Sequence, residues 1–142
     1  MNARPLHRLF NPRSIAVIGA SNTPGSIGYS LFHNLITNEF SGSVHPVNPK
    51  HDRVQGVKAY PNMASLPERV DLAVIATRAE TVPAMVNECI AAGTLSAVVI
   101  SAGFSEAGRQ GTRLSDQIRR SVQSSGMALL GPNCLGFMRP KL

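Results

Sequence analysis

The strongest indication of the fold is the stretch SIAVIGASNTPGSIG, residues 14–28. Its first part, Ser14–Gly19, is a short run of apolar and β-branched residues that ends in glycine, which is typical of a buried strand. A loop of small polar residues follows, and apolar residues then recur at helical spacing between Tyr29 and Ile36. A strand, a glycine-containing loop and an amphipathic helix in this order indicate the first unit of a parallel α/β sheet.

The same alternation of strand and helix continues along the chain. Further strands are predicted at residues 43–48, 57–60, 70–76, 97–101 and 127–131. Apolar periodicity predicts two more helices, around residues 82–90 and 114–122, which end at Gly93 and Gly126. We therefore expect an α/β fold, a Rossmann-like, doubly wound, mostly parallel sheet of about five strands with helices on both faces. Pro46 makes the strand at residues 43–48 an edge strand or the site of a bulge.

Length and composition limit the class of protein. The 142 residues, of which 43% are hydrophobic and 15% charged, suffice for one domain with its own core, expected over residues 1–142. The chain ends abruptly at Arg139–Leu142, which suggests a fragment of a longer protein. The longest apolar runs, Val70–Ala76 and Ala97–Ile100, are far shorter than the roughly 20 residues that span a bilayer, which argues against an integral membrane protein.

The two cysteines and the N-terminus bear on the cellular compartment. Cys89 and Cys134 lie far apart in the sequence, which is neither a disulfide framework nor the spacing of metal ligands. The basic N-terminal residues are not followed by the apolar segment of a secretory signal. We therefore expect a protein of the reducing cytoplasm.

The chain carries an excess of positive charge, with 14 Lys and Arg against 8 Asp and Glu and a net charge of +6. The basic residues are scattered, only 5% of the residues are aromatic, and no nucleic-acid-binding motif is recognisable, so a nucleic-acid partner is not expected. A small polyanion suits such a mildly basic domain at least as well, and a basic surface without a specific partner is the plainer alternative.

Ligands of open parallel sheets bind at the carboxyl ends of the strands, so the loops there are the candidate sites. The loop after the first strand contains Gly19, Gly25 and Gly28, and its remaining residues are small and mostly polar. Glycines allow backbone N–H groups to approach an anion, and the helix that follows presents its positive N-terminal end, so a phosphate or pyrophosphate fits there. Alternatively, the glycines only allow the helix to pack closely on the sheet.

The second strand is followed by Asn48-Pro49-Lys50, with no acidic residue before Asp52. A protein that binds NAD is expected to carry an acidic residue near this place for the ribose hydroxyls, whereas a lysine favours an additional ribose phosphate. That phosphate is present in NADP and in coenzyme A (CoA). The alternative is that Lys50 is an ordinary solvated surface lysine.

The remaining strand ends are less specific. Ala76-Thr77-Arg78 follows the strand at residues 70–76, and Ser101–Glu106 is a turn with one carboxylate. Glu106 is more readily explained by a helix start than by catalysis. The four histidines show no metal spacing, and no group of residues can be assigned as catalytic or metal-binding.

Five motifs, taken together and in order, resemble the CoA-binding domain of NDP-forming (ADP-forming) acyl-CoA synthetases. This family includes acetate–CoA ligases and, more distantly, the alpha subunit of succinyl-CoA synthetase. The motifs are LFNPRSIAVIGAS (9–21), GSIG (25–28), VNPK (47–50), SAGFSE (101–106) and GPNCLG (131–136). The resemblance covers essentially the whole chain.

The resemblance implies a set of CoA-binding residues. The loop after the first strand would hold the CoA phosphates, and Asn48-Pro49-Lys50 would lie at the adenosine 3′-phosphate. Ala76 and Thr77 would line the nucleotide, and Asn133 and Cys134 would border the thiol. These residues are Gly19, Ser21, Asn22, Gly25, Ser26, Ile27, Gly28, Asn48, Pro49, Lys50, Ala76, Thr77, Asn133 and Cys134.

The resemblance also implies a reaction that this chain performs only in part. In such enzymes a carboxylic acid, ATP and CoA give acyl-CoA, ADP and phosphate through a phosphohistidine, which lies in a swivel domain beside an ATP-grasp domain. Both domains would be partners outside this chain, which alone would bind CoA or acyl-CoA and catalyse nothing. Two alternatives remain open: a regulatory domain that senses CoA or acyl-CoA, and an NADP-binding oxidoreductase domain.

Overall fold

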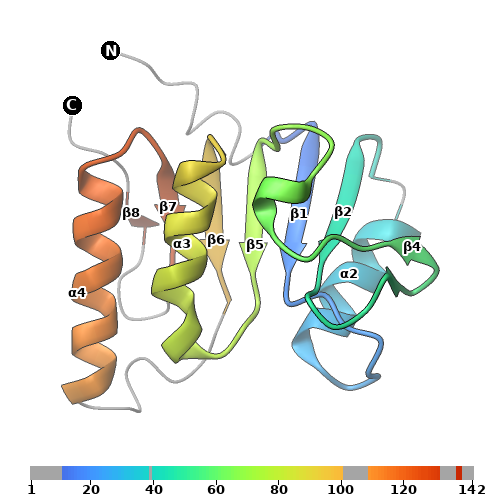
Figure 1. Ribbon diagram of the computed structural model, residues 1–142, viewed down its shortest axis with the longest axis horizontal. Helices are drawn as coiled ribbons and strands as arrows, with labels where there is room; N and C mark the ends of the chain where they lie inside the picture. Colours follow the sequence, from blue (N-terminus) through green and yellow to red (C-terminus); the bar gives the residue numbers. More distant parts are fainter. Residues whose placement is uncertain (1–10, 39, 101–108, 132–136, 139–142) are drawn as a thin grey trace.

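The computed structural model describes residues 11–38, 40–100, 109–131 and 137–138, of which 109–112 and 137–138 are described by their backbone alone. A six-stranded sheet with the order β2-β1-β5-β6-β7-β8 forms its centre (Figure 1). The strands of this sheet are β1 (Ser14–Ile18), β2 (Ser43–Val47), β5 (Leu72–Ile75), β6 (Ser96–Val99), β7 (Ala128–Leu130) and β8 (Phe137–Met138). The first five are parallel, as expected, and β8 adds an antiparallel edge that the sequence pattern did not indicate.

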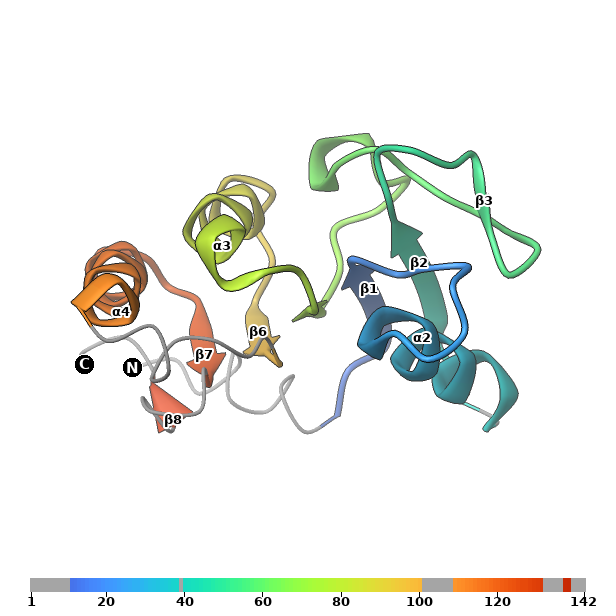
Figure 2. The same cartoon turned by 90° about the horizontal axis from the view of Figure 1, so that it is seen from below.

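Helices cover both faces of the sheet, which confirms the doubly wound arrangement. Helix α2 (Ile27–Thr37) lies on one face, and α3 (Val82–Ala91) and α4 (Arg109–Gln123) lie on the other (Figure 2). Two short 3₁₀ helices, η1 (Met63–Ser65) and η2 (Ala79–Thr81), precede β5 and α3. Within the described part of the chain, no helix is long and apolar enough to cross a membrane.

Strand β1 shows why the sequence folds in this way. All five of its residues are buried, and alternate side chains point to opposite faces of the sheet. Ile15 and Val17 belong to the core cluster around Phe32 of α2, whereas Ala16 and Ile18 belong to the larger cluster beneath α3 and α4. A strand with a buried layer on each side must be apolar throughout, as residues 14–18 are.

The second strand lies at the edge of the sheet, as Pro46 predicts. Pro46 is paired in register with Val17, and it needs no N–H donor on the outer side of β2. Its carbonyl instead accepts a hydrogen bond of 3.0 Å from the N–H of Tyr60, and the N–H of Asn48 donates to the carbonyl of Tyr60 at 2.9 Å. Segment 59–60 therefore covers part of this edge.

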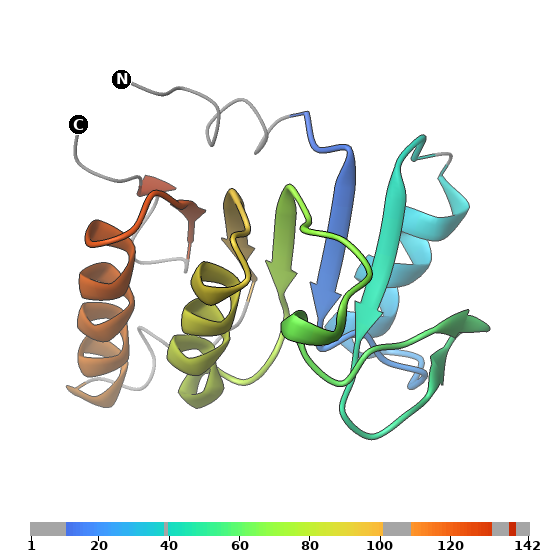
Figure 3. The same ribbon diagram turned by 45° about the horizontal axis from the view of Figure 1, so that its top comes forward.

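The short strand predicted at residues 57–60 exists only in part and is not in the main sheet. Strand β4 (Val57–Lys58) pairs antiparallel with β3 (Arg53–Val54), and the two form a hairpin beside the carboxyl ends of β1 and β2 (Figure 3). The turn consists of Gln55 and Gly56, which both have positive φ angles. A two-residue turn of this kind keeps the hairpin local, so residues 57–58 pair with their neighbours in sequence rather than with the sheet.

Strand order reverses between β1 and β5, because the chain builds β2 on one side of β1 and β5 on the other. The loops that leave β1 and β5 therefore diverge to opposite faces. A crevice forms between diverging loops at the carboxyl ends of the strands, and this is where open α/β sheets bind ligands.

Candidate functional site

A cleft of about 590 Å³ opens at this reversal of strand order. It brings together six of the residues predicted from the sequence: Gly19, Asn48, Pro49, Lys50, Ala76 and Thr77. It also includes Arg78, which the sequence analysis placed at the end of a strand. The other lining residues lie outside the predicted set of CoA-binding residues: Ile18, Val47, Pro61, Thr81, Met85 and Glu88. Its volume lies within the range of ligand pockets in proteins.

Gly19 directly follows β1, lines the cleft and lies against the ends of β2 and β5. It has a φ angle of +93°, and a Cβ atom there would lie 2.9 Å from the carbonyl oxygen of Ala76. Its N–H donates to the carbonyl of Val47 at 3.1 Å. A residue with a side chain would be strained at this φ and would collide with backbone, so glycine is required on both counts.

The Asn48 side chain holds the turn that carries Lys50. Its Nδ2 donates to the carbonyl of Ala20 at 2.9 Å, and its Oδ1 accepts hydrogen bonds from the N–H groups of Lys50 at 2.7 Å and His51 at 3.2 Å. An amide used in this way fixes the direction of the following residues, as in an Asx turn. Asn48 therefore shapes this end of the cleft from within the protein.

Two cations stand at the rim of the cleft. Lys50 is exposed and makes no ion pair with any residue that the structure describes. Arg78 is also exposed, and its Nε lies 3.3 Å from Oε1 of Glu80. Because exposed ion pairs contribute little free energy, Arg78 remains available to a stronger anion.

Glu88 brings a negative charge to the wall of the cleft. Its Oε1 accepts a hydrogen bond of 3.0 Å from the N–H of Met63, the first residue of η1. The carboxylate therefore ties α3 to η1. Met85 lies one turn before it on the same helix, and the apolar spacing that predicted this helix did not indicate that Met85 lines a cleft.

The glycine-containing loop lies beside the cleft, and its polar side chains bond within the protein. Ser21 Oγ accepts a hydrogen bond of 2.9 Å from the N–H of Thr23. Ser26 Oγ caps helix α2 by accepting from the N–H of Tyr29 at 3.2 Å, and it donates to the carbonyl of Thr23 at 2.8 Å. These hydroxyl groups shape the loop, as N-cap and ST-turn side chains do.

The backbone N–H groups of the loop differ from these hydroxyl groups in their hydrogen bonding. The N–H groups of Gly25, Ile27 and Gly28 have no acceptor among the described residues. The last two belong to the first turn of α2, where N–H groups have no carbonyl of their own helix to bond. Half of the Ile27 surface is exposed. Unpaired donors at a helix N-terminus attract anions.

Gly25 and Gly28 differ in what surrounds them. A Cβ atom at Gly28 would lie 1.9 Å from the carbonyl oxygen of Gly19, so this glycine permits the close approach of α2 to the end of β1. A Cβ atom at Gly25 would meet nothing within 4 Å, although the φ angle there is +92°. The packing explanation therefore accounts for Gly28, whereas at Gly25 it is the positive φ and not close packing that favours glycine.

Comparison with known proteins identifies the family. The model of a family described as "CoA binding domain" matches residues 13–140. The chain belongs to this CoA-binding family. Coenzyme A is thus its ligand, and the resemblance found in the sequence motifs is confirmed.

Relatives of this CoA-binding domain include ADP-forming ligases. The chain is 43% identical over 137 residues to acetate–CoA ligase [ADP-forming] I of Archaeoglobus fulgidus, covering 96% of the chain and 20% of the relative. It is 44% identical over 133 residues to the alpha subunit of acetate–CoA ligase [ADP-forming] II of Pyrococcus furiosus, covering 94% of the chain and 29% of the relative. The chain thus spans less than a third of either relative.

A solved structure agrees with this assignment. The dinucleotide-forming acetyl-coenzyme A synthetase 1 of Candidatus Korarchaeum cryptofilum, in complex with phosphate and ADP, superposes with a TM-score of 0.84 at 42% sequence identity. The match covers 92% of this chain and 28% of that protein. The Rossmann-like fold and the CoA-binding interpretation are both confirmed, and CoA is favoured over the NADP alternative.

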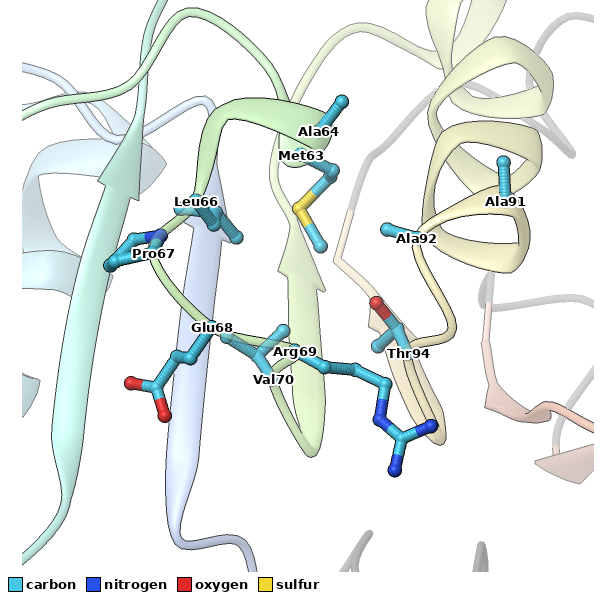
Figure 4. A pocket seen from close by; sticks show the side chains of 10 residues that line it. All are labelled: Met63, Ala64, Leu66, Pro67, Glu68, Arg69, Val70, Ala91, Ala92 and Thr94. Carbon is cyan, nitrogen blue, oxygen red and sulfur yellow. The ribbon is translucent and has the colours of Figure 1, made fainter.

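A second cavity of the CoA-binding domain, of about 420 Å³, lies at the opposite, amino ends of β5 and β6 (Figure 4). Its wall contains both apolar and polar residues, and the charged ends of Glu68 and Arg69 extend away from Met63 and Leu66 (Figure 4). The Thr94 hydroxyl is buried and has no hydrogen-bond partner in the described part of the chain. This cavity lies at the wrong end of the strands for a phosphate ligand.

The residues predicted to border the CoA thiol lie outside the described part of the chain, and the one described cysteine is buried. Asn133 and Cys134, together with the turn at 101–106, lie outside the described residues. Cys89 is a free cysteine in α3, and its burial, with a smaller effect of the neighbouring Glu88 carboxylate, raises the pKa of the thiol to about 12. A thiol with such a pKa stays protonated at neutral pH and is a poor nucleophile.

Proposed function

We propose that the cleft and the glycine-containing loop together hold the nucleotide end of coenzyme A. The diphosphate accepts hydrogen bonds from the backbone N–H groups of Gly25, Ile27 and Gly28, and Lys50 binds the 3′-phosphate. The observation that carries this proposal is that N–H donors with no acceptor among the described residues follow β1, while a lysine with no ion pair among them follows the neighbouring parallel strand β2.

Charge supports this arrangement. CoA carries about four negative charges near neutral pH, and a basic rim raises the local concentration of such a ligand. Lys50 and Arg78 supply that rim, while the Glu88 carboxylate accepts a hydrogen bond from the N–H of Met63. The phosphates would therefore stay at the rim.

The part of the cleft lined by Ala76, Thr77, Pro61 and Met85 suits the adenosine. Ala76 and Thr77 line its wall next to the end of β5, and Pro61 and Met85 add apolar surface. Flat apolar contact with a few polar groups is typical of adenine sites. Asn48 and Pro49 would act by fixing the turn that carries Lys50.

The relatives support a role in ADP-forming acyl-CoA synthesis. In this proposal the domain supplies CoA to a carboxylic acid that is activated with ATP, and acyl-CoA, ADP and phosphate are released. Swivel and ATP-grasp domains or subunits outside this chain would carry the phosphohistidine and the nucleotide. A cytoplasmic location is also proposed, and it is supported by Cys89, a free buried thiol of the kind that reducing compartments preserve.

Calorimetric titration of the chain with CoA, dephospho-CoA and NADPH tests this function. We expect CoA to bind with micromolar or weaker affinity, and dephospho-CoA to bind more weakly because it lacks the 3′-phosphate. Equal binding of the two would remove the role given to Lys50. Binding of NADPH that CoA does not displace would contradict the proposal and favour an oxidoreductase domain.

A further inference from the structure

The turn of the hairpin β3–β4 contains an unusual residue. Gln55 has a φ angle of +50°, and it is the one residue other than glycine with a positive φ in the described part of the chain. It is followed by Gly56, with a φ of +82°. Turns with two positive φ angles favour Asn, Asp or Gly at the first position, because the short polar side chain tolerates this backbone. A glutamine there needs a compensating interaction.

The Gln55 side chain provides that compensation by bridging the two ends of the glycine-containing loop. Its Nε2 donates to the carbonyl of Ser21 at 3.1 Å and to the carbonyl of Tyr29 at 3.1 Å. Ser21 opens the loop, and Tyr29 lies in the first turn of α2. One half-buried amide therefore uses both of its N–H groups to hold the two ends of the loop at a set separation.

Asn22 completes the connection from the opposite side. Its Oδ1 accepts a hydrogen bond of 2.7 Å from the backbone N–H of Gln55, and its Nδ2 donates to the carbonyl of Arg53 at 3.0 Å. The hairpin and the loop thus exchange four hydrogen bonds, although more than twenty residues separate them in sequence.

We infer that Gln55 is a positioning residue that holds the glycine-containing loop in its CoA-binding conformation. The inference rests on the proposed function, in which backbone N–H groups of this loop bind the diphosphate. Backbone donors can move only with the loop itself, so their geometry depends on whatever fixes its ends. A loop that is already ordered binds with a smaller loss of conformational entropy than one that must be ordered by the ligand.

Two substitutions separate this role from a general effect on stability. Gln55→Asn places a residue that favours the left-handed backbone in the turn, but its amide is one methylene shorter and cannot reach both carbonyl groups. Gln55→Met keeps the length and the backbone strain and has no donor. Gln117→Asn, at an exposed position of α4, is the matched control.

We expect stability and CoA affinity to respond differently. Urea unfolding should show Gln55→Asn to be at least as stable as the unaltered chain and Gln55→Met to be less stable than the unaltered chain. Calorimetry should show CoA binding about tenfold weaker in both, because both lose the bridge, and unchanged in Gln117→Asn. CoA affinity that stays unchanged in Gln55→Asn would overturn the inference. If Gln55→Met does not fold, the CoA affinity of Gln55→Asn is sufficient to test the inference.

A measurement without ligand keeps the inference distinct from the proposed function. The N–H groups of Ser26, Tyr29 and Ser30 donate hydrogen bonds in the loop and the first turn of α2. Their hydrogen exchange should be faster in both Gln55 variants than in the unaltered chain. If the unaltered chain did not bind CoA, the proposed function would fail. Unchanged exchange in the variants would overturn the bridge itself.

Discussion

The glycine-containing loop at residues 19–28 and the turn at Asn48–Lys50 follow the carboxyl ends of the neighbouring strands β1 and β2 but offer a ligand different groups. In the loop, the hydroxyl groups of Ser21 and Ser26 bond within the protein, and backbone N–H groups find no acceptor among the residues that the structure describes. In the turn, the Asn48 amide bonds within the protein, and the Lys50 side chain remains. In the proposed function, ligand binding by the loop therefore depends on the shape of its backbone, and ligand binding by the turn depends on the charge of Lys50.

Substitution of Gly28 should have the largest effect and tests the shape of the loop. In Gly28→Ala the new Cβ would lie 1.9 Å from the carbonyl oxygen of Gly19, and neither backbone segment can yield without moving α2 from the sheet. We expect a loss of about 3 kcal/mol or more in the free energy of unfolding, measured in urea. Gly126→Ala, where a Cβ meets nothing within 4 Å, is the control. Equal stability of the two variants would contradict the close packing described for the loop.

Substitution of Gly25 should have a smaller effect on stability and a direct effect on binding. Gly25→Val introduces a β-branched side chain at a φ of +92°, which costs about 1–2 kcal/mol of strain. Because the position faces open space, the new side chain would also obstruct the approach of the diphosphate to the N–H groups. CoA affinity measured by calorimetry should fall further than in Lys50→Ala. A variant that loses stability but binds CoA normally would show that the ligand does not approach Gly25.

Substitution of Lys50 should have the smallest effect and tests the turn. Lys50→Ala removes a charge-assisted contact, so CoA binding should weaken by about 1.5 kcal/mol, roughly tenfold. Dephospho-CoA should bind both forms equally, because it lacks the group that Lys50 contacts. Arg120→Ala, which removes an exposed charge from α4, should leave both affinities unchanged. If Lys50→Ala weakened CoA and dephospho-CoA alike, Lys50 would act through general charge rather than on the 3′-phosphate.

The two regions also differ in how far their roles could be predicted. Gly19, Lys50 and Ala76 were found from their positions after predicted strands, and the structure brings them into one cleft. Asn22 was expected at the ligand, yet its amide bonds to the hairpin, a contact that local sequence cannot show. Pro61 was missed although it directly follows the strand predicted at residues 57–60. Glu88 was missed because it lies near the end of α3, far in sequence from any strand end, and reaches the cleft only through the packing of that helix.

The sequence by itself determined the alternation of strands and helices, the two-sided burial of β1 and the position of the glycine-containing loop, since these follow from short apolar periods and glycine placement within a few residues. Only the tertiary structure decided that residues 53–58 form a hairpin outside the sheet and that Gln55 and Asn22 use their amides between hairpin and loop. The physical reason is that a side-chain amide bonds to whichever carbonyl the folded chain brings within reach, and that partner lies more than twenty residues away in sequence.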